Sequence, residues 1–164
     1  MSQRIVIDCL AFAREARVLS GELPITGLAR LHDNLSGTEG YLSYHIEGRM
    51  SEYDKPQLVL YLKGVLLLRC QRCLEEINFP LALDNVLEFA DDWMGLTQEE
   101  IEDDAKDFLA LQDELDAIEL IEDEILLGLP LAPRHQNCTL PAIKQRMNDD
   151  SPFAVLKNFK SKAE

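Results

Sequence analysis

The fold of this chain is decided by the stretch Gln57-Leu-Val-Leu-Tyr-Leu-Lys-Gly-Val-Leu-Leu-Leu68, which is apolar at nearly every position. Such a run predicts a β-strand, with Gly64 as a bulge or a point of close approach. Residues 41–48 alternate apolar and polar side chains, which predicts a half-buried strand with His45 on its polar face. Residues 77–89 form a third extended segment. The short links between these segments favour an antiparallel meander.

Helices are expected on both sides of this sheet. Residues 8–20 are rich in strong helix formers, and Gly21 and Pro24 follow as a plausible stop. A second helix is expected to begin at the cap residue Asp116 and to end at Leu129, before a proline.

The sequence therefore predicts an α+β fold: an antiparallel sheet, open or curled toward a barrel, with a few packed helices and an acidic loop. With 164 residues, 46% of them hydrophobic, the chain can build one main core. We expect a single domain over residues 1–145, with an acidic segment at 88–116 that includes a short return strand at 108–111. A polar tether and a short basic helix are expected at 146–164.

Acidic residues dominate the charge, and they are concentrated in one region. The formal net charge is -14. Residues 88–124 hold 16 acidic residues and 1 basic residue, a net charge of -15. Binding of nucleic acid by general charge attraction is excluded, because Lys and Arg must neutralise phosphates to supply that affinity. The acidic region is either a solvated loop or a docking surface for a basic partner.

The helix after Asp116 is expected to bury one apolar stripe, made of Ile118, Ile121, Ile125 and Leu129. Glu122 projects into this stripe, whereas the neighbouring carboxylates are expected to point elsewhere: Glu119, Asp123 and Glu124. A carboxylate in an apolar stripe needs a partner, and Arg72 or Arg69 would form a buried ion pair with it. The alternative is that Glu122 lies at the margin of the stripe and reaches water.

Two cysteine-containing pairs provide a candidate metal site. Cys70 and Cys73 flank Gln71 and Arg72, and His135 and Cys138 follow downstream. Two ligand pairs from distant segments are the usual construction of a tetrahedral zinc site, so zinc is the candidate cofactor. Neither pair contains the Gly or Pro that usually lets the backbone fold around thiolates. The alternative is that the thiols are merely close and His135 is a loop residue, and Cys9 is expected to be a small buried core residue.

Enzyme chemistry finds little support in the sequence. A redox cysteine needs a low pKa, and Glu75 and Glu76 beside the Cys70–Cys73 turn are expected to raise it. The chain lacks a hydrolase elbow, a phosphate-binding loop, a dinucleotide glycine pattern and an HExxH motif. No small-molecule substrate and no catalytic residue is predicted.

The sequence also predicts a cytoplasmic protein without a membrane association. The first apolar run is broken by a charge after three residues, so it cannot form a secretory signal. No apolar stretch approaches the length needed to span a bilayer.

Three blocks occur in order, and together they resemble the YceD family, the large ribosomal RNA subunit accumulation proteins. The blocks are Leu68-Arg-Cys-Gln-Arg-Cys73, Ile121-Glu-Asp-Glu-Ile-Leu-Leu-Gly-Leu-Pro-Leu-Ala-Pro133 with His135 and Cys138, and Pro152-Phe-Ala-Val-Leu-Lys157. The family motif C-x-R-C is matched by Cys70, Arg72 and Cys73. Many members carry further cysteines after the Leu-Pro-x-x-Pro element, where this chain has only His135 and Cys138.

The resemblance implies a role in the synthesis, processing or stability of large-subunit (23S-type) ribosomal RNA, without an established reaction. Because the chain is acidic, the expected partner is a basic ribosomal protein or assembly factor. An alternative is direct contact with the ribosomal RNA precursor through a local cluster of basic side chains: Arg69, Arg72, Arg134, Lys157, Lys160 and Lys162. A zinc-dependent or thiol-dependent processing activity is a third hypothesis.

Overall fold

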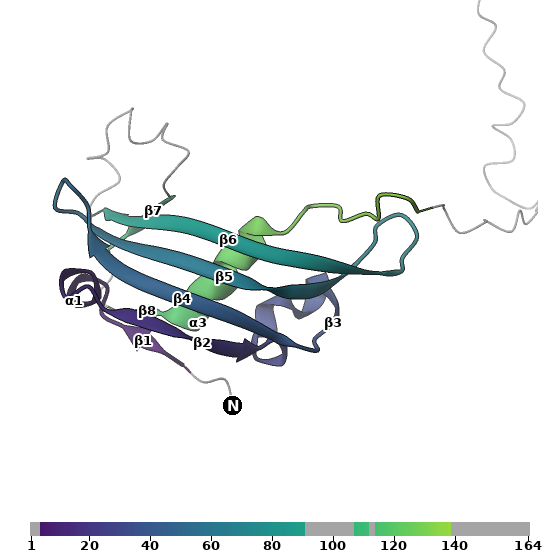
Figure 1. The fold of residues 1–164 in the computed structure, drawn as a ribbon, viewed down its shortest axis with the longest axis horizontal. Helices are drawn as coiled ribbons and strands as arrows, with labels where there is room; N and C mark the ends of the chain where they lie inside the picture. The colour runs from purple at the N-terminus through teal and green to yellow at the C-terminus, as the bar shows by residue number, and fades with distance from the viewer. Residues whose placement is uncertain (1–3, 91–106, 112–113, 139–164) are drawn as a thin grey trace, which may run out of the picture.

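The computed structural model describes residues 4–90, 107–111 and 114–138 (Figure 1). They form a mixed α+β fold in which the long strands lie side by side and one helix crosses a face of the sheet. The predicted tether and helix at 146–164, and most of the predicted acidic loop, lie outside the described residues.

The predicted meander is confirmed. It consists of β4 (Tyr41–Met50), β5 (Pro56–Arg69) and β6 (Glu76–Ala90), joined by antiparallel ladders. The strand order is β2-β4-β5-β6-β7, with β2 (Val18–Pro24) and β7 (Asp107–Ala110) at the two edges. The sheet of the described residues is therefore open and does not close into a barrel.

Strand β5 is the centre of this sheet, as its sequence predicts. The alternate side chains that face the core are almost fully buried: Leu58, Leu60, Leu62, Leu66 and Leu68. Gly64 stays in register opposite Leu42 and Leu81, so it is not a bulge. A Cβ atom there would lie 3.2 Å from the carbonyl oxygen of Tyr41, which makes it a point of close approach.

Helix α1 (Cys9–Arg14) is much shorter than the predicted helix over residues 8–20. Asp8 caps its start, and the chain leaves the helix at Ala16, whose φ is 47°. From Val18 onward it pairs with β4 instead, because the sheet contacts outweigh a local helix preference. Cys9 is completely buried in the core, as predicted.

The strand predicted at 108–111 is present as β7, but it pairs in parallel with β6 and therefore does not extend the antiparallel meander. A separate two-stranded sheet is formed by β1 (Val6–Ile7) and β8 (Leu115–Asp116). Strand β3 (Leu35–Gly37) pairs with the end of β5 and follows two short 3-10 helices, η1 (Ile25–Gly27) and η2 (Ala29–Asn34).

Helix α3 (Ala117–Gly128) begins where the sequence predicts. Asp116 accepts a hydrogen bond from the backbone N–H of Ile118 at 2.9 Å, and the helix stops before the Leu-Pro pair. Ile118, Ile121 and Ile125 are buried as expected. No helix in the described part of the chain is long and apolar enough to cross a membrane.

Glu124 departs from the prediction that it points away from the core, because it is only 3% exposed. The helix is in contact on two sides: Glu122 meets η2, and Glu124 accepts a hydrogen bond from Asn85 of β6. A helix with contacts on two sides buries more than one stripe of side chains. The spacing of its apolar residues alone could therefore not predict that Glu124 is buried.

Candidate metal centre

The turn between β5 and β6 is built around Cys70. Its backbone N–H donates to the carbonyl of Glu75 at 2.8 Å, and its own carbonyl accepts from the N–H of Leu74 at 2.9 Å. The N–H of Arg72 points at the Cys70 sulfur, 3.4 Å away. These contacts wrap the backbone around the first thiol and direct an N–H group toward it.

Leu74 adopts the left-handed backbone conformation that a Gly residue would usually provide in such a turn. Its φ is 66°, in the left-handed region that glycine adopts most readily. The turn therefore forms without Gly or Pro, at some cost in backbone strain. The side chain of Leu74 is 66% exposed, so it meets little steric opposition in this conformation.

The segment after α3 brings the second ligand pair to this turn. The N–H of Gln71 donates to the carbonyl of Pro133 at 2.8 Å, which fixes the two segments against each other. His135 and Cys138 lie just beyond this contact. The 61 residues that separate Cys73 from His135 in the sequence are thus no obstacle to assembly of the site.

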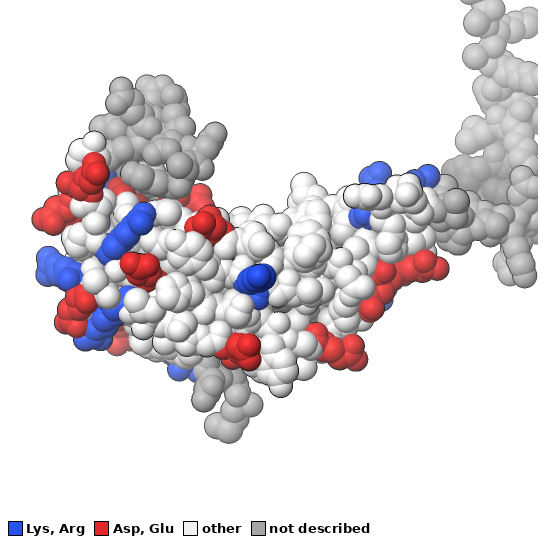
Figure 2. Space-filling view, viewed as in Figure 1, with Lys and Arg blue, Asp and Glu red and all other residues white. Residues whose placement is uncertain are grey.

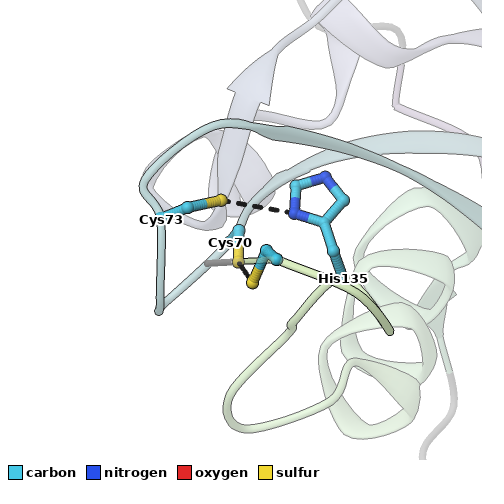
Figure 3. Close-up of side chains that lie close together, drawn as sticks. Cys70, Cys73 and His135 are labelled. Atoms are coloured by element: carbon cyan, nitrogen blue, oxygen red, sulfur yellow. Dashed lines mark hydrogen bonds between the residues drawn. The ribbon is translucent and has the colours of Figure 1, made fainter. Parts of the chain in front are cut away.

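Cys70, Cys73 and His135 lie close together (Figure 3). With Cys138 they form a group of four that is positioned to bind a metal ion. Their ligand atoms all lie within 4.8 Å of one another. The sulfurs of Cys70 and Cys138 are 3.7 Å apart, and the sulfur of Cys73 is 3.3 Å from Nδ1 of His135. Tetrahedral zinc with its usual bond lengths would require about 3.8 Å between sulfurs and about 3.6 Å between sulfur and nitrogen. These two separations lie within about 0.3 Å of those values, and the other separations do not exceed 4.8 Å.

The orientation of the His135 ring is fixed by a contact on the side of the ring that faces away from the cysteines. Its Nε2 lies 3.0 Å from the backbone carbonyl of Glu76, while Nδ1 faces Cys73. A histidine that ligates a metal through one nitrogen commonly donates the other N–H to a carbonyl, which sets its tautomer. The first residue of β6 therefore positions the imidazole for ligation.

The electrostatics favour a thiolate at Cys70. Burial alone would raise its pKa, but hydrogen bonds from the backbone of Cys73, His135 and Arg72 lower the pKa to about 5. This outcome corrects the expectation that Glu75 and Glu76 would raise it. At Cys73, a backbone hydrogen bond from Glu75 lowers the pKa, but burial and the neighbouring thiols leave it above the ordinary value.

The pKa of His135 is raised by the Cys70 sulfur and then by the Glu76 carbonyl. Only the shift at Cys70 favours the deprotonated form, because N–H groups support negative charge on its sulfur. The raised pKa values of Cys73 and His135 favour their protonated forms, so a metal ion would have to displace those protons in order to bind.

The predicted ion pair between Arg72 and Glu122 is not formed among the described residues. Glu122 is only 5% exposed and accepts a hydrogen bond from the backbone N–H of Arg30 at 3.0 Å. Arg72 is exposed, in the metal-site turn. The short 3-10 helix that provides the partner had no signal in the sequence, because its contact with α3 spans 92 residues.

The acidic region is less available than its sequence indicates. Four of its carboxylates are buried: Glu88, Asp116, Glu122 and Glu124. Glu88 accepts a hydrogen bond from Gln57, its pairing partner on β5, and forms an ion pair with Lys55 at 3.4 Å. Exposed carboxylates in the described part of this region are Asp107, Glu114, Glu119 and Asp123. Among the described carboxylates of this region, only this second group is exposed to a partner.

Comparisons with known proteins point to one family. A family model described as large ribosomal RNA subunit accumulation protein YceD matches residues 58–160. The large ribosomal RNA subunit accumulation protein YceD of Haemophilus influenzae is 30% identical over 135 residues, which cover 69% of this chain and 72% of that protein. No solved structure matches.

Proposed function

The chain belongs to the YceD family, and we propose that it is a non-enzymatic cytoplasmic factor that supports synthesis, processing or stability of large-subunit ribosomal RNA. The family match, which spans 58–160, carries this proposal. The printed name of the family describes accumulation of an RNA, and no reaction is included in that description.

The proposed partner is a basic ribosomal protein or an assembly factor. A net charge of -14 opposes broad contact with phosphates and favours a cationic protein surface. Three exposed carboxylates of the region 88–124 have no ion-pair partner within the described residues: Asp107, Glu114 and Glu119. They are available for complementary contacts with Lys and Arg.

The proposed cofactor is a structural zinc ion held by Cys70, Cys73, His135 and Cys138. Three sulfurs and one imidazole nitrogen form a ligand set that zinc prefers. Four protein ligands complete a tetrahedral shell, whereas catalytic zinc sites keep one position open for water or substrate. The ligand count therefore favours a role in holding the segment after α3 to the sheet.

The function is tested by depletion of the protein in its own cells. We expect the ratio of large-subunit to small-subunit ribosomal RNA to fall, and the wild-type chain to restore it. The protein should also sediment with large-subunit precursors at low salt. An unchanged RNA ratio after complete depletion, together with sedimentation of the protein alone, would contradict the proposal.

A second candidate is direct contact with RNA through basic side chains at the metal-site end. Arg69 and Arg72 flank the first thiol, and Arg134 lies beside Pro133, whose carbonyl contacts Gln71. All three are exposed and form no ion pair within the described ranges. Of the three, Arg69 lines a groove of about 430 Å³ together with Gln71 and Pro133.

The other basic residues of this candidate patch are outside the described ranges: Lys157, Lys160 and Lys162. The test is the affinity of the full chain for large-subunit RNA fragments at several salt concentrations. Phosphate contacts would make the affinity fall steeply with salt, and replacement of the three arginines by alanine would flatten that slope. A salt-independent or absent interaction would remove this candidate.

The third hypothesis, a zinc-dependent or thiol-dependent processing activity, is separated from a structural role by the variant C70S/C73S. If the variant protein is folded and abundant in cells but processing of the precursor stops, a chemical role is favoured. If RNA accumulation follows only the amount of folded protein, the site is structural.

A further inference from the structure

The face of the sheet that points away from α3 has a composition unlike the rest of this acidic chain. Ladder pairing places Tyr41, Val65 and Pro80 near one another across three strands, since Val65 pairs with Pro80 and Tyr41 is next to Leu42, the partner of Gly64. Two rungs along the same face, His45 pairs with Tyr61. These residues alternate with the buried core positions, so they share the outer surface.

Large apolar and aromatic groups are exposed on this outer face. Tyr41 is 67% exposed, Val65 48% and Tyr61 43%. The rings of His45 and Tyr61 are in contact, with centroids 5.9 Å apart. Single exposed apolar residues need no explanation, but several on adjoining strands form a patch of the kind that interaction sites use.

Charged side chains lie on this face both within the patch and beside it. Lys63 lies between the two aromatic rungs, paired with Ser43 on β4 and Ala82 on β6. Glu22, Glu47 and Asp84 stand on three different strands of the same face. None of these charged groups forms an ion pair within the described part of the chain. Figure 2 shows a largely uncharged surface over the middle of the long strands, interrupted by a basic group, with acidic and basic side chains mixed toward its left end.

We propose that this outer face, centred on Tyr41, Tyr61 and Val65, is the docking surface for the basic protein partner. Interface centres are depleted in charge and enriched in Tyr, while the rim is polar. The three carboxylates would meet Lys or Arg side chains of the partner and set its orientation. The inference rests on the proposed partner class, and it adds the outer face of the sheet to the exposed carboxylates of region 88–124 as a contact for that partner.

The charges on this face also disfavour two other binding partners, single-stranded RNA and a second copy of this chain. Single-stranded RNA could stack on the aromatic rings, but Glu22, Glu47 and Asp84 would repel its phosphates. A second copy of this chain would bring the same carboxylates together at a net charge of -14 for each copy. The three carboxylates outnumber Lys63 among the charged groups named on this face, so a cationic protein surface is the occupant that fits both its apolar groups and its acidic side chains.

The first test places a photo-crosslinking amino acid at Tyr61 of the full chain in cells, with position 127 as the control. Leu127 is 78% exposed on α3, the helix that covers the opposite face. We expect Tyr61, but not Leu127, to crosslink to a basic protein, and the same crosslink to form again with that protein purified. Crosslinks to RNA, to a second copy or to this chain's own tail would overturn the proposal, as would the absence of any crosslink.

The second test measures binding to a mixture of purified large-subunit ribosomal proteins. V65D and Y61S should each weaken binding by about 10-fold or more, because both act at the patch centre. L127D should leave binding unchanged. The double variant E47K/D84K should reduce both the affinity and its salt dependence. Equal binding by all four variants, or no binding to the mixture, would refute the assignment.

These readouts are independent of the proposed function. Binding and crosslinking are measured without reference to ribosomal RNA levels, and thermal unfolding of each variant shows whether it is folded. If depletion leaves RNA levels unchanged but the crosslink forms, the proposed function is contradicted and the proposed docking surface is supported. If depletion lowers RNA but Y61S and V65D rescue it fully and bind normally, the surface fails alone.

Discussion

Glu122 and Arg30 are joined across the interior by a hydrogen bond from the Arg30 backbone N–H to the Glu122 carboxylate, 3.0 Å long. The guanidinium of the same arginine pairs with Asp123 at 2.6 Å. Two consecutive carboxylates of α3 therefore hold one residue of η2, one by its backbone and one by its side chain. The buried contact is the stronger of the two, because the pair with Asp123 is half exposed to water.

Replacement of Glu122 by alanine should lower the free energy of unfolding by about 1–3 kcal/mol, since it leaves the Arg30 N–H without its acceptor. E122Q keeps an acceptor oxygen and should cost less. D123A removes only the exposed pair and should change stability by less than about 1 kcal/mol. Urea unfolding of the three variants checks this order, and a D123A cost equal to that of E122A would contradict it.

The purified chain should contain about one zinc ion per molecule, and C73S or C138S should lose most of it. Chelation should lower the melting temperature of the wild type but not of these variants, because they have no ion to lose. C9A is the matched control: it removes a buried thiol outside the cluster and should keep the metal. Metal analysis of the four proteins decides, and metal-free wild type from zinc-supplemented cells would be evidence against the site.

Gly48 is a position where the backbone of α1 lies very close to the sheet. A Cβ atom there would lie 2.7 Å from the carbonyl carbon of Phe12, which is backbone and cannot rotate away. G48A should therefore destabilise the protein by about 3 kcal/mol or more. G27A is the control, because its nearest neighbour would be Pro24 at 3.8 Å. Equal melting temperatures for the two variants would show that α1 does not pack as described.

Glu124 should make stability depend on pH. Burial raises its pKa above 4.5, Asn85 partly opposes this, and Asp107 adds to the rise. The folded protein therefore binds this proton more tightly than the unfolded chain, so stability falls as the pH rises through and above the ordinary carboxyl pKa. E124Q should be more stable than the wild type at pH 7, and the gap should close below about pH 4. Denaturant unfolding at several pH values measures the gap, with the exposed E119Q as the control.

The meander and the ligand set could be predicted because both are encoded in short-range patterns. Alternation with a period of two residues marks Leu42, Tyr44 and Ile46, and their burial follows from strand geometry alone. The spacing of Cys70, Cys73, His135 and Cys138 also identified them as candidate ligands, and the structure brings the four together. In both cases residue type and spacing contain the necessary information.

Features that depend on tertiary contacts could not be predicted. Residues 15–20 have helix-forming composition, yet their pairing partner on β4 decides that the chain becomes a strand. The partner of Glu122 is a backbone N–H, which any residue provides, so no side-chain pattern identifies it. The left-handed conformation of Leu74 could not be predicted either, because the hydrogen bonds of the surrounding turn impose it.

The two halves of the metal cluster are synthesised at different times. The strands that present Cys70 and Cys73 can pair before His135 and Cys138 exist, because chains emerge from their N-terminus. An ion bound by all four residues could be captured only once α3 is docked, so its binding would be a late event in folding. Conversely, partial opening that frees the segment after α3 would leave an ion with two thiols and a fast route to exchange. The rate of metal release would thus report the rate at which that segment detaches from the sheet.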